Sequence, residues 1–316
     1  MPQYSALCCY FGQWPTHFQQ WLTTCQYNKD IRFFLVTDIP VDGFEIPDNV
    51  QVINKSFSEI QALVVTKFID IKISLDRPYK LCDFKTAYGY IFDDLFQGYD
   101  YWGYYDIDTF WGDILSFIPN NEDAHLVKIF PCGHLSFIKN TAPWNKIFEL
   151  VNQVSGVPCK DNMQGKVVAT WQDCFSSSDS YFYDEEGGLE PMMLSISSPR
   201  YLGTDFDNLL PPWRFDHFYS INFPERSRFL IYSYVEGHLF RYFLRGLKVC
   251  RDEISYVHAS KRVFSIDCNH TANKFVIYPN RIVQWYEPSL FFLLIHGRYR
   301  YFSNYCRKVL RRLFRK

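Results

Sequence analysis

In the first 110 residues, short apolar runs alternate with helical stripes of apolar side chains, and this alternation constrains the fold more than any other feature. The strand candidates are residues 5–11, 31–37, 50–53 and 101–105. Between them, sequences of the capping-box type open helices at Thr16–Gln19 and Ser56–Glu59, and a third helical stripe covers residues 84–95. Strand–helix–strand units pair their strands in parallel through right-handed crossovers. The sequence therefore predicts an α/β fold with a mixed, mostly parallel central sheet flanked by helices.

The second half of the chain is less regular. Its candidate elements are strands over 126–130, 134–138, 254–257 and 274–278, a helix over 144–151 and a hairpin over 229–244. Residues 155–225 are rich in Gly, Ser, Pro and Asp, so we expect long loops there. The chain has no internal repeat and no low-complexity linker. We therefore expect one domain over residues 1–288, followed by a tail over residues 289–316.

Two carboxylates follow the aromatic strand candidate at residues 101–105. Asp106 and Asp108 are two residues apart at the end of that strand, where parallel sheets place their ligands. Their hard oxygen atoms suit Mn²⁺ or Mg²⁺, which would neutralise a departing diphosphate. Gly12 and Asp38 also follow strand candidates, which indicates a nucleotide site. A solvated acidic turn is the alternative, and the aromatic run before the pair counts against it.

A second polar cluster lies in the segment 78–89, where a helix is predicted to begin. Lys80, Asp83 and Lys85 stand close together there. Helix amides and lysines suit phosphate, and Asp83 could hold a sugar hydroxyl. An ordinary charged first turn of a helix explains the same residues equally well.

A third cluster follows the strand candidate at residues 254–257. His258 ends this strand and precedes Lys261 and Arg262. An imidazole can supply one metal ligand, and the two cations can contact phosphate. A lone histidine is more often structural, but the basic pair beside it favours a functional role.

Asp106-Ile107-Asp108 resembles the DxD motif of GT-A glycosyltransferases. The wider order of motifs resembles a bacterial group found among polysaccharide-assembly proteins. The matching segments are Tyr10-Phe11-Gly12, Thr37-Asp38, Pro78 to Gly89, Trp102 to Asp108 with Gly112-Asp113, and His258 to Arg262. The resemblance is dense over residues 8–140, thinner over 155–250, and returns near residue 258.

This resemblance implies a GT-A-like, Rossmann-like fold and a transferase activity. The enzyme would move a hexose from a nucleotide-diphosphate donor, with a UDP-sugar as the expected donor. The acceptor would be a glycan or a lipid-linked saccharide in surface polysaccharide biosynthesis. Residues 1–140 would form the nucleotide-sugar half, and residues 141–288 the acceptor half.

The resemblance also implies a role for each matching residue. The nucleoside would be held by Phe11, Gly12 and Asp38. The donor sugar and its phosphates would be held by Lys80, Asp83 and Lys85. The metal shell would consist of Asp106, which also contacts ribose, together with Asp108 and His258. The diphosphate would be held by Lys261 and Arg262.

An inverting transferase needs a carboxylate base near the acceptor hydroxyl, whereas a retaining one does not. Asp184 and Glu185, with Glu186 beside them, lie in the loop-rich region and are the candidates for this base. Asp173 is another. A solvated acidic loop before a Gly-Gly turn explains these carboxylates equally well, and the sequence leaves the stereochemistry open.

The tail is basic and amphipathic. Residues 302–313 place apolar side chains at helical spacing, and Lys and Arg fill the opposite side. Residues 289–316 contain eight Lys or Arg and no acidic residue, in a chain whose net charge is −1. Such a helix suits an anionic membrane surface, where each basic residue contributes about 1 kcal/mol. A helix packed on the domain is the alternative, and the acidic remainder of the chain argues against nucleic acid.

The cellular compartment that we expect follows from features that the sequence lacks. No basic n-region precedes the first apolar run, and residues 290–295 fall far short of the ~20 apolar residues that span a bilayer. The ten cysteines form no CxxC pair, which is typical of reduced thiols. We expect a cytoplasmic protein that is peripheral on the inner face of the plasma membrane.

Two other functions fit part of the same sequence. Asp106 to Thr109 resembles the DxDxT start of phosphatases, in which the first Asp is a nucleophile and the second an acid–base. That motif usually follows the first strand of its domain, whereas about a hundred residues precede it here. A non-catalytic protein that binds sugar nucleotides is the other alternative.

Overall fold

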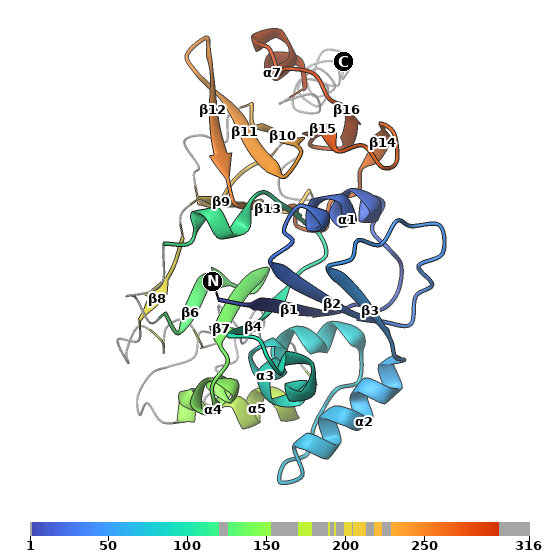
Figure 1. Cartoon of the computed structure of the whole chain (residues 1–316), viewed down its shortest axis with the longest axis vertical. Coiled ribbons are helices and arrows are strands. Elements are labelled where there is room, and N and C mark those ends of the chain that lie inside the picture. The colour runs from blue at the N-terminus through green and yellow to red at the C-terminus, as the bar shows by residue number, and fades with distance from the viewer. Residues whose placement is uncertain are drawn as a thin grey trace, which may run out of the picture.

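The structure, a computed structural model, describes residues 2–119, 126–152, 170–178, 189, 193, 199–203, 205–212, 218–222 and 229–296 (Figure 1). These residues form a mixed α/β fold with three sheets. A seven-stranded sheet with its helices occupies one end, and a six-stranded sheet occupies the other. A three-stranded sheet lies between them. The predicted α/β class is confirmed.

The seven-stranded sheet contains the mostly parallel part of the fold. Its strands, in spatial order, are β3 (Val50–Asn54), β2 (Ile31–Thr37), β1 (Tyr4–Cys9), β4 (Tyr101–Tyr105), β7 (Leu135–Lys139), β6 (Lys128–Cys132) and β8 (Arg200–Tyr201). The first four are parallel, and β7 is antiparallel to both of its neighbours. The four predicted strands of the first 110 residues are confirmed, and parallel pairing brings their carboxyl ends to one edge.

Helices cover both faces of this sheet (Figure 1). One face packs against α1 (Phe18–Gln26), through the predicted stripe of apolar side chains, and against the 3-10 helix η3 (Ile114–Phe117). The other face packs against α2 (Phe57–Lys67), η1 (Pro78–Ala87), α3 (Tyr88–Ile91), η2 (Asp93–Phe96), α4 (Ala142–Asn145), η4 (Ile147–Asn152) and α5 (Trp171–Ser176). The predicted helices over 84–95 and 144–151 are therefore broken into short 3-10 and α pieces. The apolar stripe of the first, and Trp144, Ile147 and Phe148 of the second, are nevertheless buried or packed against the core.

The two predicted capping boxes have different outcomes. The box at Ser56 is confirmed: its hydroxyl accepts from the Glu59 N–H at 3.3 Å, and the Glu59 carboxylate accepts from the Ser56 N–H at 2.8 Å. The box at Thr16 is wrong, because α1 begins two residues later and has no side-chain cap. The Thr16 hydroxyl accepts instead from the Phe264 N–H at 3.1 Å, and this bond ties the helix start to the second half of the chain.

The six-stranded sheet is built around the predicted hairpin. Its strands, in spatial order, are β12 (Lys248–Ile254), β11 (His238–Arg245), β10 (Ile231–Val235), β15 (Lys274–Tyr278), β16 (Arg281–Gln284) and β14 (Ser265–Asp267). β10 and β11 pair antiparallel across Glu236 and Gly237, which both have positive φ, as the tight turn of a hairpin requires. The hairpin is confirmed.

The helix α7 (Leu290–His296) packs on the outer face of the six-stranded sheet through Leu293, which is fully buried. The predicted amphipathic helix over 302–313 lies outside the described residues. Within the part of the chain that is described, none of the helices combines the length and apolarity that crossing a bilayer requires.

A buried histidine lies where the first and second halves of the chain meet. The His17 ring precedes α1 and packs 5.0 Å from the Phe110 ring and 5.1 Å from the Phe264 ring, measured between centroids. Neither of its ring nitrogens has a hydrogen-bond partner among the described residues. Burial lowers the pKa of His17 from 6.5 to about 4, against the opposing charge of Asp108.

This shift predicts an acid-sensitive fold. Below pH 6.5 the unfolded chain protonates His17, whereas the folded protein does so only near pH 4, so stability falls across that window. We expect His17→Phe to remove roughly 2 kcal/mol of the stability loss between pH 7 and pH 4.5. Urea unfolding of both proteins at the two pH values measures this difference. An identical loss in the two proteins would contradict the assignment.

Candidate metal and nucleotide site

The three-stranded sheet aligns segments that are far apart in the sequence. Its strands are β5 (Thr109–Trp111), β13 (Tyr256–His258) and β9 (Phe206–Asn208), with β13 in the centre. β13 runs antiparallel to β5 and parallel to β9, and the register pairs His258 with both Thr109 and Asn208. Asp108 directly precedes β5, so this register carries it to the side of His258.

Asp106, Asp108 and His258 meet at this point. The His258 Nε2 atom lies 3.3 Å from Asp108 Oδ1 and 3.9 Å from Asp106 Oδ2, and one atom from each residue lies within 4.8 Å of the others. Ligand atoms of one octahedral Mn²⁺ or Mg²⁺ ion stand about 3 Å apart, because each bond is about 2.1 Å long. Two carboxylates and an imidazole at these distances fit a divalent cation after a small adjustment.

Asp108 is held by the turn that follows β13. Its carboxylate Oδ2 accepts from the Lys261 N–H at 2.6 Å, and its carbonyl oxygen accepts from the Ala259 N–H at 2.8 Å. Burial by itself would raise the pKa of Asp108, but the His258 imidazole and the Lys261 N–H together lower it well below its usual range. The carboxylate is therefore ionised, as a metal ligand must be.

The same turn adopts an uncommon backbone conformation. Ser260 and Lys261 have φ values of 48° and 59°, in the left-handed region that side chains other than glycine rarely occupy. The Ser260 hydroxyl donates to the Leu209 carbonyl oxygen, which helps to hold the turn. Strain of this kind persists only where surrounding contacts fix it, and it gathers at functional sites.

Two of the predicted lysines reach the cluster or its rim. The Lys85 Nζ atom lies 2.7 Å from Asp106 Oδ1 and 2.8 Å from the Gly133 carbonyl oxygen, and its side chain is buried. The Lys261 Nζ atom donates to the Tyr79 hydroxyl at 3.0 Å, in an exposed position. The first lysine orients a carboxylate, whereas the second is accessible to a ligand.

Three other predicted contacts of the donor are not supported by the packing. Lys80 and Asp83 form a fully buried ion pair at 2.8 Å, and Lys80 Nζ also donates to the Cys174 carbonyl oxygen. Arg262 is 3% exposed and donates to the carbonyl oxygens of Leu210 and Pro279. Because these side chains are enclosed by protein partners, a structural role accounts for them.

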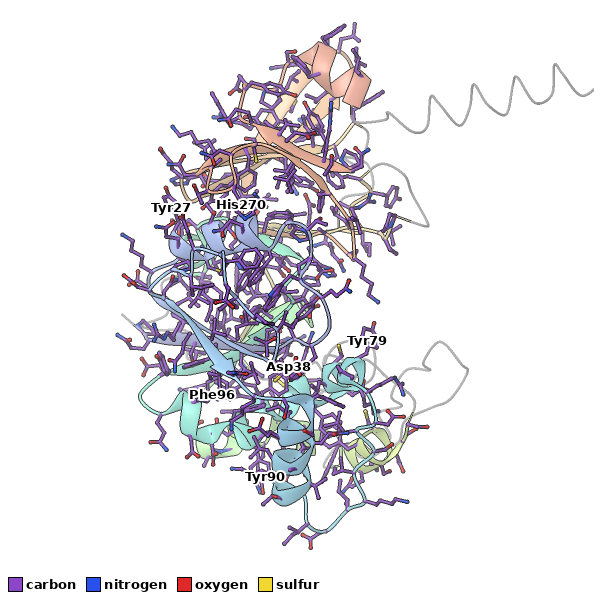
Figure 2. The ribbon with its side chains drawn as sticks, turned by 90° about the vertical axis from the view of Figure 1, so that its right-hand side faces the viewer. Tyr27, Asp38, Tyr79, Tyr90, Phe96 and His270 are labelled. Carbon is purple, nitrogen blue, oxygen red and sulfur yellow. The ribbon has the colours of Figure 1, made fainter. Side chains whose placement is uncertain are left out.

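The predicted nucleoside residues lie at the ends of β1 and β2, on the same edge as Asp106. Phe11 is half-buried and packs edge-on against Phe57, at 5.6 Å between ring centroids. Gly12 has a φ of 118°, which disfavours any other residue there. Asp38 is exposed (Figure 2). Their place at the carboxyl edge agrees with the prediction, and their contact with a nucleoside stays a prediction.

The candidate bases divide into two groups. Asp184 and Glu185 lie outside the described residues. The Asp173 carboxylate accepts from the Thr170 hydroxyl at 2.9 Å, and that hydroxyl accepts in turn from the Asp173 N–H at 3.2 Å. This reciprocal pair caps the start of α5, which gives Asp173 a structural explanation.

Three residues near the cluster were given no role from the sequence. Asn208 Oδ1 lies 3.0 Å from His258 Nδ1, and the His134 ring stacks on the His258 ring with a centroid distance of 4.6 Å. Tyr79 meets Lys261, as described above. Asn208 belongs to a three-residue strand without a periodic pattern, His134 lies at the start of the predicted strand over 134–138, and Tyr79 lies in the segment 78–89.

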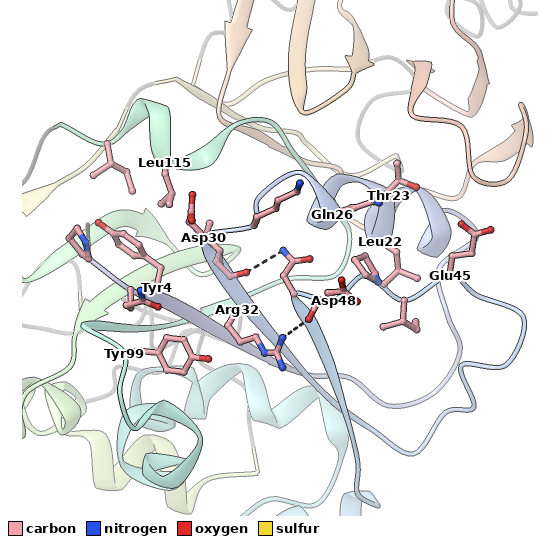
Figure 3. A pocket seen from close by; sticks show the side chains of 18 of the residues that line it. Tyr4, Leu22, Thr23, Gln26, Asp30, Arg32, Glu45, Asp48, Tyr99 and Leu115 are labelled. Carbon is pink, nitrogen blue, oxygen red and sulfur yellow. Dashed lines mark hydrogen bonds between the residues drawn. The ribbon is translucent and has the colours of Figure 1, made fainter.

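A cleft of about 900 Å³ lies at the opposite edge of the seven-stranded sheet (Figure 3). Residues near the amino-terminal ends of β1 and β2 line it, among them Tyr4, Asp30 and Arg32. The Arg32 guanidinium is already engaged with the Asp48 carbonyl oxygen and the Gln51 side chain. The cleft is therefore separate from the strand ends that carry the predicted chemistry.

The buried ion pair can be tested against its predicted binding role. Lys80→Met leaves the Asp83 carboxylate without that partner, so we expect a loss of about 3–5 kcal/mol in the free energy of unfolding. Adding Asp83→Leu should restore part of the loss. Lys67→Met, which breaks an exposed pair with Asp93, is the control and should cost about 1 kcal/mol or less. Equal small losses for both lysines in guanidinium unfolding would argue against the structural role.

Comparisons with known proteins relate most of the chain to one family model. The model described as a family of unknown function, DUF6625, matches residues 6–286. No curated protein matches the chain.

Two solved structures show a weak likeness. Galactosyltransferase LgtC, in complex with donor and acceptor sugar analogs, has 9% identity and a TM-score of 0.34, over 65% of this chain and 75% of that one.

The second structure is mouse xyloside xylosyltransferase 1 in its apo form. It has 9% identity and a TM-score of 0.37, over 81% of this chain and 97% of that one. TM-scores below 0.5 carry no weight for fold or function, whereas the family model spans most of the sequence. The chain therefore belongs to DUF6625, a family of unknown function.

Proposed function

We propose that this protein is a metal-assisted glycosyltransferase of the GT-A type. The observation that carries the proposal is the meeting of Asp106, Asp108 and His258 at the carboxyl edge of parallel strands. A diphosphate leaving group concentrates negative charge, which cations fixed at such an edge stabilise. The order of motifs along the chain, which resembles that of GT-A enzymes, supports the same reaction.

In this proposal Asp106, Asp108 and His258 hold Mn²⁺ or Mg²⁺. The ion would act as a Lewis acid that stabilises the charge developing on the diphosphate oxygen. Lys85 holds the second oxygen of the Asp106 carboxylate, and the N–H of Lys261 holds that of Asp108. The protein thus fixes both carboxylates from behind and leaves their other oxygens facing His258.

The donor is proposed to be a UDP-sugar whose nucleoside lies along the ends of β1 and β2. Asp38 is exposed there and can accept from uracil or ribose, next to Gly12 and Phe11. The exposed ammonium of Lys261 can contact the diphosphate beside the metal. The acceptor is proposed to be a glycan or lipid-linked saccharide of surface polysaccharide biosynthesis. In an inverting reaction, Asp184 or Glu185 would serve as the base.

The metal assignment predicts the outcome of a thermal-shift screen of nucleotide sugars with and without Mn²⁺. A ligand that binds the folded state raises the melting temperature by mass action. We expect UDP-sugars to raise it in wild type only when Mn²⁺ is present, and Asp108→Asn to abolish this shift. Asp70→Asn, which changes an exposed carboxylate after α2, should leave the shift intact.

Other outcomes of this screen would identify the alternatives. Release of phosphate from small phosphomonoesters, with its loss in Asp106→Asn and no shift with any nucleotide sugar, would favour the phosphatase. A manganese-dependent shift without donor hydrolysis or transfer to any acceptor would favour a binding protein. A full shift in Asp108→Asn would overturn the metal assignment.

We also propose that the tail holds the enzyme on an anionic membrane, at the inner face of the plasma membrane. The helix α7 leads into the basic sequence of residues 297–316. Although Leu293 is buried, Phe291 and Leu294 are 66% and 42% exposed. Exposed apolar side chains next to a basic sequence suit the interface of an anionic bilayer.

Vesicle co-sedimentation tests this attachment. The full chain should bind vesicles that contain phosphatidylglycerol and release them at high salt, because charge drives part of the binding. We expect Phe291→Ser with Leu294→Ser to weaken binding several-fold. Val65→Ser with Ile69→Ser is the matched control, because both side chains are exposed, one on α2 and one just after it, at the other end of the molecule (Figure 1). Equal binding to neutral vesicles would contradict the proposal.

A further inference from the structure

One side of the His258 ring faces the two carboxylates, and the other side faces Asn208. The Nε2 atom is the one that lies near Asp106 and Asp108, whereas Nδ1 lies 3.0 Å from the amide oxygen of Asn208. We propose that Asn208 is a positioning residue that accepts the Nδ1–H of His258 in the metal-bound site and so holds Nε2 toward the metal ion. The inference deepens the proposed function, since it rests on His258 being a metal ligand.

The chemistry of a neutral imidazole makes this contact decisive. One ring nitrogen donates a hydrogen bond and the other accepts, so a partner on one nitrogen determines the state of both. The amide oxygen of Asn208 can only accept, which places the proton on Nδ1. A metal ion needs the lone pair of the other nitrogen, and histidine ligands are commonly held in this way by a second group.

The backbone places the two side chains side by side. β9 and β13 are parallel neighbours, and their register pairs Asn208 with His258. Because paired residues of adjacent strands project to the same face, the amide lies beside the ring without any long side-chain reach. The Ser260 hydroxyl also lies near Nδ1, but it is 3.5 Å away and donates to the Leu209 carbonyl oxygen. Asn208 is therefore the closer acceptor.

Strand β9 is fixed from its opposite face. Asp207 is fully buried there and accepts from the Ser220 hydroxyl at 2.6 Å, the Tyr232 hydroxyl at 3.1 Å and the Arg241 guanidinium at 3.2 Å. Successive residues of a strand point to opposite faces, so this network anchors the strand while Asn208 points to the site. The position of the amide is thus set by a buried network and not by the site itself.

The plane of the ring is set separately. The His134 ring stacks on the His258 ring at an interplanar angle of 19°. Both nitrogens of His134 are buried and have no hydrogen-bond partner among the described residues, so His134 contacts His258 by ring stacking and not by a hydrogen bond. With the plane held by His134 and the edge held by Asn208, Nε2 can point only toward the carboxylates.

The test uses the full chain and compares Asn208→Leu, Asn208→Asp and Asn222→Leu. The Asn222 side chain also bonds to β9, but it does so through the Phe206 carbonyl oxygen and not through Asn208, so Asn222→Leu controls for loss of strand support. NMR of ¹⁵N-labelled histidine in the protein saturated with diamagnetic Mg²⁺ reads whether the Nδ1–H of His258 is hydrogen-bonded. Titration with Mn²⁺ followed by electron paramagnetic resonance gives the affinity.

With Mg²⁺ bound, we expect a hydrogen-bonded Nδ1–H in the wild type, Asn208→Asp and Asn222→Leu, because each retains an acceptor oxygen beside that nitrogen. In Asn208→Leu this hydrogen bond should be lost, and affinity for Mn²⁺ should fall about 10- to 100-fold. If Asn208→Leu fails to fold, Asn208→Ser takes its place, since its shorter side chain does not reach the ring.

A wild-type Nδ1–H that is not hydrogen-bonded when Mg²⁺ is bound would overturn the inference. So would unchanged Mn²⁺ affinity in a folded Asn208→Leu, or an equal loss in Asn222→Leu. The proposed function fails by a different result. If the metal binds with the expected hydrogen bond but no nucleotide sugar binds or reacts, the role of Asn208 stands and the transferase assignment falls.

Discussion

The pairing of β5 with β13 is the constraint on which the site depends. It joins residues 109–111 to residues 256–258, and so brings the second half of the chain against the carboxyl edge of the parallel sheet. Asp108 is then held at both its carbonyl oxygen and its carboxylate by the turn after β13. Without this pairing, Asp106 would remain at the end of β4 and His258 would lie on another part of the molecule. One short antiparallel ladder thus converts two separate motifs into one ligand set.

The strained turn at residues 259–261 follows from the same constraint. Glycine would adopt the left-handed conformation of Ser260 and Lys261 at little cost, yet both positions carry side chains that are used. The hydroxyl of Ser260 fixes the turn to Leu209, and the ammonium of Lys261 reaches Tyr79 across the site. The turn therefore combines two tasks, since its backbone orients the Asp108 carboxylate while the Lys261 side chain presents a cation. That combination explains why the strain is retained.

The sequence predicts strands best where a short continuous segment is fully buried. Strands β1, β2 and β4 are buried along nearly their whole length, so their apolar runs alone revealed them. The carboxylates Asp38 and Asp106 at the ends of β2 and β4 indicated the edge where a ligand would bind. His258 was found because a basic pair follows it. Strands β5 and β9 are three residues long and form only by pairing with β13, so no local sequence pattern predicts them. Asn208 was missed for that reason.

The predicted lysines show a different limit. In a sequence, a lysine beside a carboxylate looks the same whether it binds phosphate or forms a buried ion pair. The two cases differ only in whether other parts of the chain bury the lysine. Lys80 is covered by α5, which supplies the Cys174 carbonyl oxygen from 94 residues away, and the pair with Asp83 becomes internal. Capping at Thr16 failed for the same reason, since a distant N–H takes the hydroxyl.

The burial of the predicted lysines and arginine changes which cations could contact a donor. Of the four cations predicted to hold the donor, Lys80, Lys85 and Arg262 are buried against protein acceptors, and Lys261 is exposed. A buried ammonium that already holds Asp106 cannot also turn to a phosphate without leaving that carboxylate unpaired, which is costly in a desolvated position. In the proposed site Lys85 would therefore support metal binding, and the attraction for a diphosphate would fall to the metal and Lys261. Because the metal would supply most of that charge, donor binding in such a site should follow the metal ligands more closely than the lysines.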